Sequence, residues 1–386
     1  MKICALICEF NPFHNGHKYL IDKLKALEYD HIIAIMSGNY VQRGEPAIIS
    51  KKYRTEIALE CGVDLVVEIP TIWAVSNAQT YASAAVDIAN SLGCVDFLAF
   101  GSECGNIECL KKILIEVKKP EFSAVLKKQL SLGLTFAKAR EIAVGVVCGN
   151  SNDAKILRES NNNLGIEYLN ALEKIGSNIK PVTIKRDRKK FLSATEIRDL
   201  IKNKDLNIKN YIPKPSFDII SNYENKITDL YGSEKVILSC LRMLSQENIL
   251  NLPDVNEGIE NRIIKAVSSS TGLSEIFFKI KTKRYTMARI KRIILSAYLG
   301  ITKDMQKNLP QYIRVLGMNE KGQKILKKAK SVASLPVVFE YSQIKKLDNF
   351  AQRIFQKECT CTDLYSLFSN EILPCGEEQK FKIIRR

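Results

Sequence analysis

The first 200 residues alternate short apolar runs with helix-like segments, and this alternation constrains the fold more than any other feature. Five runs are brief, and are rich in Val and Ile or bounded by turn residues, as buried parallel strands are: Ile3–Glu9, His31–Ser37, Val63–Ile69, Val95–Gly101 and Pro181–Lys185. Helical patterns lie between them, over His17–Leu27, Lys51–Cys61 and Ala82–Leu92. The alternation predicts an α/β fold with a doubly wound parallel sheet, in which ligands bind beyond the carboxyl ends of the strands.

Beyond about Arg198 the pattern changes to helical spacing with few strands. Helices are expected over Lys235–Leu244, Asn261–Ser268, Thr286–Leu299 and Lys321–Val332. The stretch Asn203–Ser216 contains two prolines that disfavour a helix, so we expect it to be a linker. The chain of 386 residues is therefore predicted to form two domains, an α/β domain over residues 1–202 and a mainly helical domain over residues 203–386.

The formal net charge of +16 is unevenly divided between these two parts. Residues 1–200 hold 26 Lys and Arg against 23 Asp and Glu, which is a net charge of +3. Residues 201–386 hold 32 against 19, which is a net charge of +13. This division favours catalysis in the nearly neutral first part and a polyanionic partner for the basic second part.

The sequence shows no signal for export, a membrane span or a disulfide framework. Its start, MKICALICEFNPFHNGH, predicts a strand and a polar loop rather than a secretory signal, and no apolar run approaches the roughly 20 residues of a membrane span. The 11 cysteines are scattered without a CxxC pair, and the only histidines are His14, His17 and His31, which argues against a zinc site. We therefore expect a cytoplasmic protein with reduced thiols, no membrane partner and no metal ligands of its own.

The segment NPFHNGHKYLI, residues 11–21, directly follows the first predicted strand and opens a helix. Backbone amides at a helix N-terminus bind anions, and Gly16 allows the backbone to approach a phosphate closely. His14 and His17 are three residues apart, so both can donate hydrogen bonds to phosphoryl oxygens as negative charge builds on them. We interpret this turn as a triphosphate site with two catalytic histidines. The simpler interpretation is that both histidines only cap the helix or line a loop.

The turn resembles the HxGH signature of the nucleotidylyltransferase superfamily, whose members activate a substrate with the α-phosphate of ATP and release pyrophosphate. A second segment, LSATEIR over residues 192–198, resembles the ISSTxIR motif of the same superfamily. There Ser193 or Thr195 can cap a helix and donate to the β and γ phosphates, and Arg198 can clamp them bidentately. Alone this segment equally fits an ordinary capped helix, but its order and distance relative to HxGH favour the ATP site.

Three further blocks narrow the resemblance to one family. Residues 37–70, 100–103 and 161–172 together resemble the bacterial tRNA-Met cytidine acetate ligases, and the likeness runs over essentially the whole chain. It implies a Rossmann-like nucleotidylyltransferase domain followed by a helical tRNA-binding domain. It also implies that acetate and ATP give acetyl-adenylate and pyrophosphate. The N4 amine of the wobble cytidine of elongator tRNA-Met would then take the acetyl group to form N4-acetylcytidine and AMP.

The resemblance further implies which residues line the ATP site. Most lie at the end of the first strand and in the turn after it: Ile7, Cys8, Glu9, Phe10, Asn11, Pro12, Phe13, His14, Asn15, Gly16, His17, Lys18, Tyr19 and Leu20. The others are Gly101, Asn162, Arg186, Ser193 and Thr195. Without the resemblance, Gly101 would be interpreted as a turn glycine, Asn162 as a turn or cap residue, and Arg186 as a solvated charge.

One segment departs from the family. Members commonly carry a longer connection with a His-Asp pair before the SAT segment, whereas only Asp187–Phe191 stands here. The groups that orient acetate or the cytosine amine are therefore not assigned, and Lys185 or Arg188 can take the place of Arg186 in the alignment. No carboxylate cage for a metal is visible, so Mg²⁺ is expected to arrive with ATP, held mainly by phosphate oxygens and water.

The densest run of positive charge lies in the basic half, over residues 279–292. Its cations are Lys279, Lys281, Lys283, Arg284, Arg289, Lys291 and Arg292. These cations for phosphates, with Tyr285 for stacking on a splayed base, predict RNA binding. The competing interpretation is a solvated basic helix face, which the charge excess of the whole half disfavours. Residues 321–330 form a weaker second basic segment.

Two other functions stay open on the sequence alone. A small-molecule adenylyltransferase acting on a phosphorylated metabolite would share HxGH and SATEIR, but it gives no reason for the basic helical half. A non-catalytic RNA-binding protein with a vestigial nucleotide site is disfavoured because His14, Gly16, His17 and Arg198 are all present.

Overall fold

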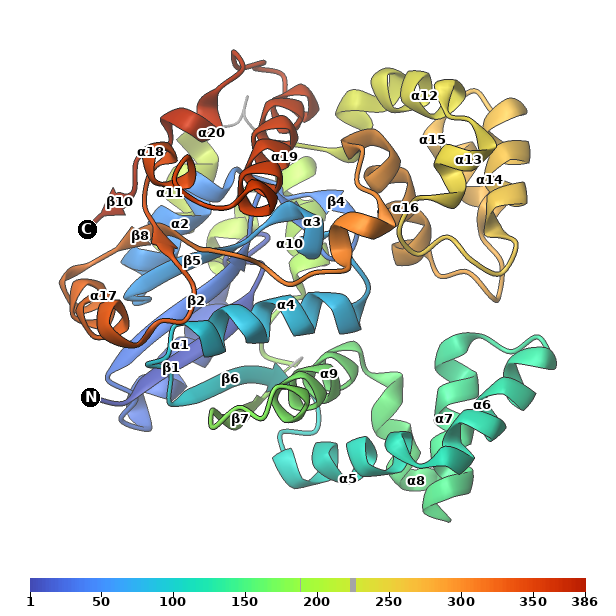
Figure 1. Cartoon of the computed structure of the whole chain (residues 1–386), viewed down its shortest axis with the longest axis horizontal. Helices are drawn as coiled ribbons and strands as arrows, with labels where there is room; N and C mark the ends of the chain where they lie inside the picture. Colours follow the sequence, from blue (N-terminus) through green and yellow to red (C-terminus); the bar gives the residue numbers. More distant parts are fainter. Residues whose placement is uncertain (188, 223–226) are drawn as a thin grey trace.

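The computed structural model describes residues 1–187, 189–222 and 227–386, and a mixed β-sheet lies at its centre (Figure 1). The strand order is β10-β8-β5-β2-β1-β6-β7, and β9 pairs with β8. The first part supplies β1 (Ile3–Cys8), β2 (His31–Ser37), β5 (Leu65–Ile69), β6 (Phe97–Ser102) and β7 (Lys180–Lys185). These five strands pair in parallel, with β1 between β2 and β6, so the predicted doubly wound α/β sheet is confirmed.

Alternate residues of each strand point to opposite faces of the sheet, and each face has its own apolar core. In β1, Ile3 and Ala5 belong to one core, and Cys4 and Leu6 belong to the other. The first face is covered by α4 (Ala78–Ser91) and α9 (Ser160–Lys174). The second face is covered by α1 (Asn15–Ala26), α2 (Lys51–Glu60), α10 (Ala194–Lys202) and α11 (Lys214–Asn222).

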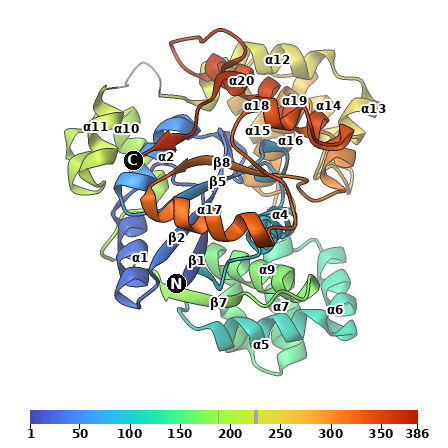
Figure 2. The same cartoon turned by 60° about the vertical axis from the view of Figure 1, so that its left-hand side comes forward.

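The second part of the chain adds strands to the same sheet, in a region where helical spacing predicts few strands. β8 (Ile313–Met318) pairs antiparallel with β5, and β9 (Val337–Val338) and β10 (Ile384–Arg385) pair parallel with β8. Figure 2 shows α17 (Glu320–Val332) lying across β8 and β5. Every residue of β8 is buried, and such a short run without alternation cannot be told from a helix segment by periodicity. The mainly helical part expected over residues 203–386 therefore also extends the sheet.

Two groups of helices lie beside the sheet. The first follows β6: α5 (Ile107–Lys118), α6 (Pro120–Ser131), α7 (Phe136–Cys148), α8 (Ser151–Ala154) and a 3₁₀ helix at Lys155–Arg158. The second, at the upper right of Figure 1, comprises α12 (Glu234–Met243), α13 (Gln246–Leu250), α14 (Ile259–Ser268), α15 (Leu273–Ile280) and α16 (Met287–Leu299). The helices predicted in residues 235–332 agree with α12, α14, α16 and α17.

The remaining elements are short, apart from one long helix near the end of the chain. They are β3 (Tyr40–Val41), β4 (Glu45–Pro46), α3 (Thr71–Ala74), α18 (Tyr341–Ile344), α19 (Asn349–Tyr365), α20 (Glu377–Lys380), and 3₁₀ helices at Leu206–Asn210, Leu230–Ser233, Lys303–Gln306 and Ser366–Phe368. β3 and β4 form an antiparallel hairpin of their own.

The stretch Asn203–Ser216, expected to be a linker, is structured. It contains a 3₁₀ helix at Leu206–Asn210 and the first turn of α11. Pro215 is the second residue of α11 and does not interrupt it. In the first turn of a helix the N–H that proline lacks has no intrahelical partner, so a proline there is tolerated.

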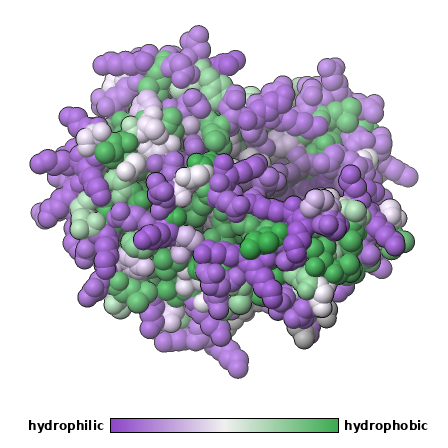
Figure 3. Space-filling model, turned by 60° about the horizontal axis from the view of Figure 1, so that its bottom comes forward, coloured by the Kyte–Doolittle hydropathy of each residue, from purple (hydrophilic) through white to green (hydrophobic). Residues whose placement is uncertain are grey.

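Figure 3 shows the face at the bottom of Figure 1, where charged and polar side chains surround smaller apolar patches. Among the helices of the described residues, none is both long and apolar enough to cross a membrane.

Candidate active site

The turn between β1 and α1 is held by its own two histidines. His14 is the N-cap of α1, and its Nδ1 accepts a hydrogen bond from Gly16 N at 3.0 Å. His17 Nδ1 in turn accepts from His14 N at 3.2 Å, and the two rings stack with centroids 3.7 Å apart. A Cβ at position 16 would lie 2.8 Å from His14 Cε1, so the glycine is needed for this packing. Both histidines therefore do cap the helix, and the cap fixes the orientation of both rings.

Both imidazoles are neutral. Burial and the nearby Arg186 lower the pKa of His14 to about 3. Burial, His14 and Arg186 also hold the pKa of His17 well below its ordinary value. Because each Nδ1 already accepts a backbone hydrogen bond, the neutral ring carries its proton on Nε2. Each histidine thus keeps one N–H donor for a phosphoryl oxygen.

Residues of the expected linker hold this turn from outside. Asn15 N donates to Tyr211 O and Asn15 Nδ2 donates to Asn210 O, both at 3.0 Å. Ser216 Oγ donates to Phe13 O, also at 3.0 Å. Ser216 and Phe13 are 203 positions apart in the chain, so no local pattern in the sequence predicts these contacts.

A buried arginine that no sequence motif marks holds the carboxyl ends of β1 and β2. Arg54 of α2 is fully buried and donates to Glu9 O at 2.7 Å, to Ser37 O at 3.0 Å and to Gly38 O. The Glu9 carboxylate accepts from Gln42 N at 2.8 Å. Burial raises the pKa of Glu9, although several arginines nearby act in the opposite direction. Buried hydrogen bonds therefore connect the strand ends next to the turn to α2 and to Gln42.

Helix α10 brings Arg198 to the turn. Ser193 caps this helix by accepting from Glu196 N at 3.3 Å, and the Glu196 carboxylate accepts from Ser193 N at 2.7 Å. Arg198 donates to Asn11 O at 2.8 Å and to Thr195 Oγ1 at 3.2 Å. The structure thus places SATEIR beside the HxGH turn, and the contact of these side chains with phosphate stays a prediction.

The predicted ATP-site residues Gly101, in β6, and Arg186, directly after β7, lie side by side. A Cβ on Gly101 would lie 3.2 Å from Arg186 Cγ, and Arg186 N donates to Ser102 O at 2.9 Å. Asn162 is buried, and its Oδ1 accepts from the backbone N–H groups of residues 103 and 104 at 3.0 and 3.1 Å. Asn162 therefore shapes the loop after β6, and its direct contact with ATP stays a prediction.

Phe191, at the end of the shortened segment 187–191, lies against α1. The ring of Phe191 is 5.3 Å from that of Tyr19, and Asp187 Oδ1 accepts from Lys189 N and Lys190 N, each at 3.1 Å. Arg188, the alternative to Arg186, lies outside the described residues.

Known proteins match the chain over nearly its whole length. The HIGH Nucleotidyl Transferase family matches residues 1–380. The tRNA(Met) cytidine acetate ligase of Caldanaerobacter subterraneus subsp. tengcongensis is 42% identical to it over 95% of each chain. That of Clostridium acetobutylicum is 36% identical over 100% of each chain. This chain belongs to the tRNA(Met) cytidine acetate ligase family.

The structural comparison agrees with this assignment. The crystal structure of Thermotoga maritima TmcAL bound with alpha-thio ATP is 33% identical to this ligase-family chain and has a TM-score of 0.93. The likeness covers 100% of this chain and 99% of the Thermotoga maritima chain. The α/β nucleotidylyltransferase fold and the helical part are therefore both shared with a protein whose structure contains an ATP analogue.

In this member of the ligase family, much of the basic run is engaged inside the protein. Arg289 Nε donates to Asp254 O at 3.0 Å, and Arg292 Nε lies 2.8 Å from Asp254 Oδ2. Tyr285 is only 5% exposed and donates its hydroxyl to Glu257 O at 2.7 Å. The prediction that the Tyr285 ring stacks on an RNA base is therefore wrong, because the ring packs into the helical core.

Three of the other cations of this run also have partners within the protein. Lys291 pairs with Glu45, and Lys279 lies 2.6 Å from Glu275 Oε1. Lys281 Nζ donates to Tyr285 O at 3.0 Å. Lys283 and Arg284 are exposed in the turn between α15 and α16, so they are the cations of the run best placed for RNA.

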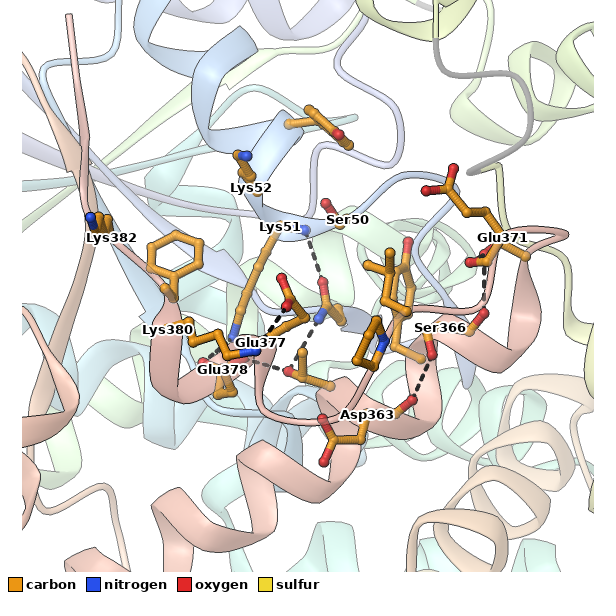
Figure 4. Close-up of a pocket in the computed structure, with 18 residues that line it drawn as sticks. Ser50, Lys51, Lys52, Asp363, Ser366, Glu371, Glu377, Glu378, Lys380 and Lys382 are labelled. Carbon is orange, nitrogen blue, oxygen red and sulfur yellow. Dashed lines mark hydrogen bonds and ion pairs between the residues drawn. The ribbon is translucent and has the colours of Figure 1, made fainter.

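A separate cavity of about 430 Å³ opens at the N-terminus of α2, and the side chains lining it are drawn in Figure 4. None of the residues predicted to bind ATP lines it. In its wall, the buried Lys51 Nζ lies 2.5 Å from Glu68 Oε1 and 2.7 Å from Glu378 Oε1. Burial raises the pKa of Glu68 to about 7, whereas Arg314 and Lys51 outweigh burial and lower that of Glu378 to about 2. We interpret this ion cluster as a structural tie between β5, α2 and α20.

Proposed function

We propose that this protein uses ATP to ligate acetate to the N4 amine of the wobble cytidine of elongator tRNA-Met. An acetate oxygen attacks the α-phosphorus of ATP, and the bond from that phosphorus to the pyrophosphate oxygen breaks. The N4 amine then attacks the acetyl carbonyl and loses a proton, and AMP leaves with the electrons of the acyl C–O bond. The products are N4-acetylcytidine, AMP and pyrophosphate.

The observation that carries this proposal is the pair of neutral histidines, anchored through Nδ1, at the N-terminus of α1 beside Arg198. Donors fixed in this way stabilise negative charge that develops on phosphoryl oxygens. We assign His14, His17 and Arg198 to that role. The rest of residues 7–20, with Gly101, Asn162, Arg186, Ser193 and Thr195, would form the wall of the ATP site.

The other participants are proposals of the same kind. Within the described residues, no group of three or more His, Cys, Asp or Glu side chains is placed to hold a metal ion. We therefore propose that Mg²⁺ enters with ATP, bound by phosphate oxygens and water. Residues 1–202 would carry the chemistry, residues 203–386 would bind tRNA, and the cytoplasm, where ATP and tRNA occur, would be the place of action.

Purified protein with ATP, Mg²⁺, acetate and elongator tRNA-Met is expected to give N4-acetylcytidine, detected by mass spectrometry of the digested RNA. Without tRNA, pyrophosphate release should still require acetate, because acetyl-adenylate forms first. Initiator tRNA-Met is the matched control substrate. If a phosphorylated metabolite triggered pyrophosphate release and acetate did not, the protein would be a small-molecule adenylyltransferase instead.

Exchanging Lys283 and Arg284 together for Ser is expected to weaken tRNA binding and to reduce the slope of log affinity against log salt by about 2, since each cation contributes roughly one phosphate contact. Filter binding at several salt concentrations measures both quantities. Lys307→Ser, which removes an exposed lysine of the same half, is the control. An unchanged slope in the double variant would place the RNA elsewhere.

A further inference from the structure

The segment Gln42-Arg43-Gly44-Glu45, here called the QRGE hairpin, lies between the nucleotide turn and helix α16. Its Gln42 N donates to the Glu9 carboxylate at 2.8 Å, and Gln42 O accepts from Arg292 of α16 at 3.4 Å. Gly44 has φ +78°, and a Cβ there would lie 2.4 Å from Arg292 N. The backbones of the hairpin and α16 are thus in direct contact, and the hairpin is bonded to the end of β1 on its other side.

The carboxylate of Glu45 in this hairpin lies between two cations from distant parts of the chain. Its Oε1 pairs with Lys291 Nζ of α16, and its Oε2 lies 3.8 Å from an Nη of Arg198 on α10. The side chains of Glu45 and Lys291 are each 23% exposed, and that of Arg198 is 15% exposed. All three charges are therefore screened less than charges on an open surface.

We propose that Lys291 controls Arg198 through Glu45. Lys291 neutralises the carboxylate that would otherwise hold the Arg198 guanidinium and repel the ATP phosphates. The nucleotide site is then complete only when α16 is seated on the QRGE hairpin. Of these three residues, Arg198 touches ATP, whereas Lys291 and Glu45 are positioning residues. The inference rests on the ATP site of the proposed function, and it adds a link from the helical group to that site.

The dependence of the Lys291 effect on Glu45 distinguishes this link from a merely structural contact. Without Lys291, the carboxylate of Glu45 is left to Arg198, so less positive charge reaches the phosphates. Without Glu45, no carboxylate at this position competes with the phosphates for Arg198, so the presence or absence of Lys291 matters little. A purely structural pair would instead change stability with no such dependence of ATP affinity on Glu45.

Calorimetric titration with Mg²⁺-ATP, in the absence of acetate and tRNA, tests the link. Lys291→Met is expected to weaken ATP binding about fivefold, which is the upper end of the effects measured for exposed ion pairs. In a Glu45→Gln background, the same exchange should change the affinity less than twofold. Lys307→Met is the control. Equal effects of Lys291→Met in both backgrounds, or none in either, would overturn the proposal.

A backbone variant tests the seating of α16 without changing a charge. Gly44→Ala is expected to push the hairpin away from Arg292 N and to weaken ATP binding as Lys291→Met does. Gly133→Ala is the matched control, because Gly133 has φ +79° and nothing within 4 Å of its Cβ position. Both variants carry the same backbone strain, and only the first meets α16. If both weakened ATP binding alike, strain and not seating would be the cause.

These measurements test the link between Lys291 and Arg198 independently of the proposed reaction. A wild-type protein that binds ATP but gives no N4-acetylcytidine would refute the ligase activity while leaving the titrations decisive for the link. Normal acetylation together with additive effects of Glu45→Gln and Lys291→Met would refute the link alone.

Discussion

Replacing His17 by Gln is expected to slow acetyl-adenylate formation about 10²- to 10³-fold while leaving the stability of the fold nearly unchanged. Glutamine at this position of a capping box can still accept the hydrogen bond that His17 Nδ1 accepts from His14 N. It lacks the imidazole Nε2–H that faces the phosphates in the proposed reaction. His14→Asn should act in the same way, because asparagine is among the best N-caps. Acetate-dependent pyrophosphate release without tRNA measures the rate.

The alanine variants of both histidines are the matched controls for the cap. They lose the donor and the cap together, so each should also lose about 1 kcal/mol of stability. If the Gln and Asn variants kept the wild-type rate while the Ala variants lost it, the histidines would be caps only.

The pH profile gives an independent check of the same assignment. The pKa of His14 is lowered to about 3 and that of His17 is far below its ordinary value, so both rings stay neutral between about pH 5 and 9. No step in the rate near pH 6.5 is expected from them. A rate that fell as the pH rose through this value would show that a protonated histidine is the active form.

The parts of the fold that the sequence predicted are those with strong local signals. Four of the five parallel strands are mostly buried apolar runs, whereas β7, at the edge of the sheet, is half-buried to exposed. The HxGH turn and the Ser193 cap are patterns that lie within a few residues. β8 was missed because its six residues carry no periodicity of their own. Its place in the sheet is decided by pairing with β5, which lies about 250 residues earlier in the chain.

The candidate site likewise contains residues that the sequence predicts and residues that it does not. The sequence predicted which residues of the turn and of SATEIR come together, and the structure places Arg198 on Asn11 O. It could not predict Arg54, whose four backbone partners come from three different segments. The prediction for Tyr285 was wrong because a basic run that contains a tyrosine has the same sequence pattern whether the ring faces RNA or the protein core.

Replacing Lys51 by Met is expected to lower the free energy of unfolding by about 3–5 kcal/mol, the usual effect of removing one partner from a buried ion pair. The ammonium lies 2.5 Å from Glu68, 2.7 Å from Glu378 and 3.6 Å from Glu358, and all four side chains are buried. Without it, Arg314 is left to balance Glu68 and Glu378, while Glu358 loses its ion pair with Lys51 and keeps the hydrogen bonds from Thr71. Urea unfolding measures the loss. Lys112→Met, which breaks an exposed pair with Asp153, should leave the unfolding midpoint unchanged.

Lowering the pH should restore part of the stability that Lys51→Met removes. Burial raises the pKa of Glu68 to about 7 while Lys51 lowers it, so loss of Lys51 raises this pKa further. The folded state then binds the proton more tightly than the unfolded state, and its stability increases as the pH falls from about 8 toward 5. Glu68→Gln imitates the protonated carboxyl and should recover stability in the Lys51→Met background at pH 8. If Lys51→Met lost the same free energy of unfolding at pH 8 and at pH 5, protonation of Glu68 would not relieve the unpaired charge. The loss would then come from the other broken ion pairs of Lys51, with Glu358 and with Glu378 of α20.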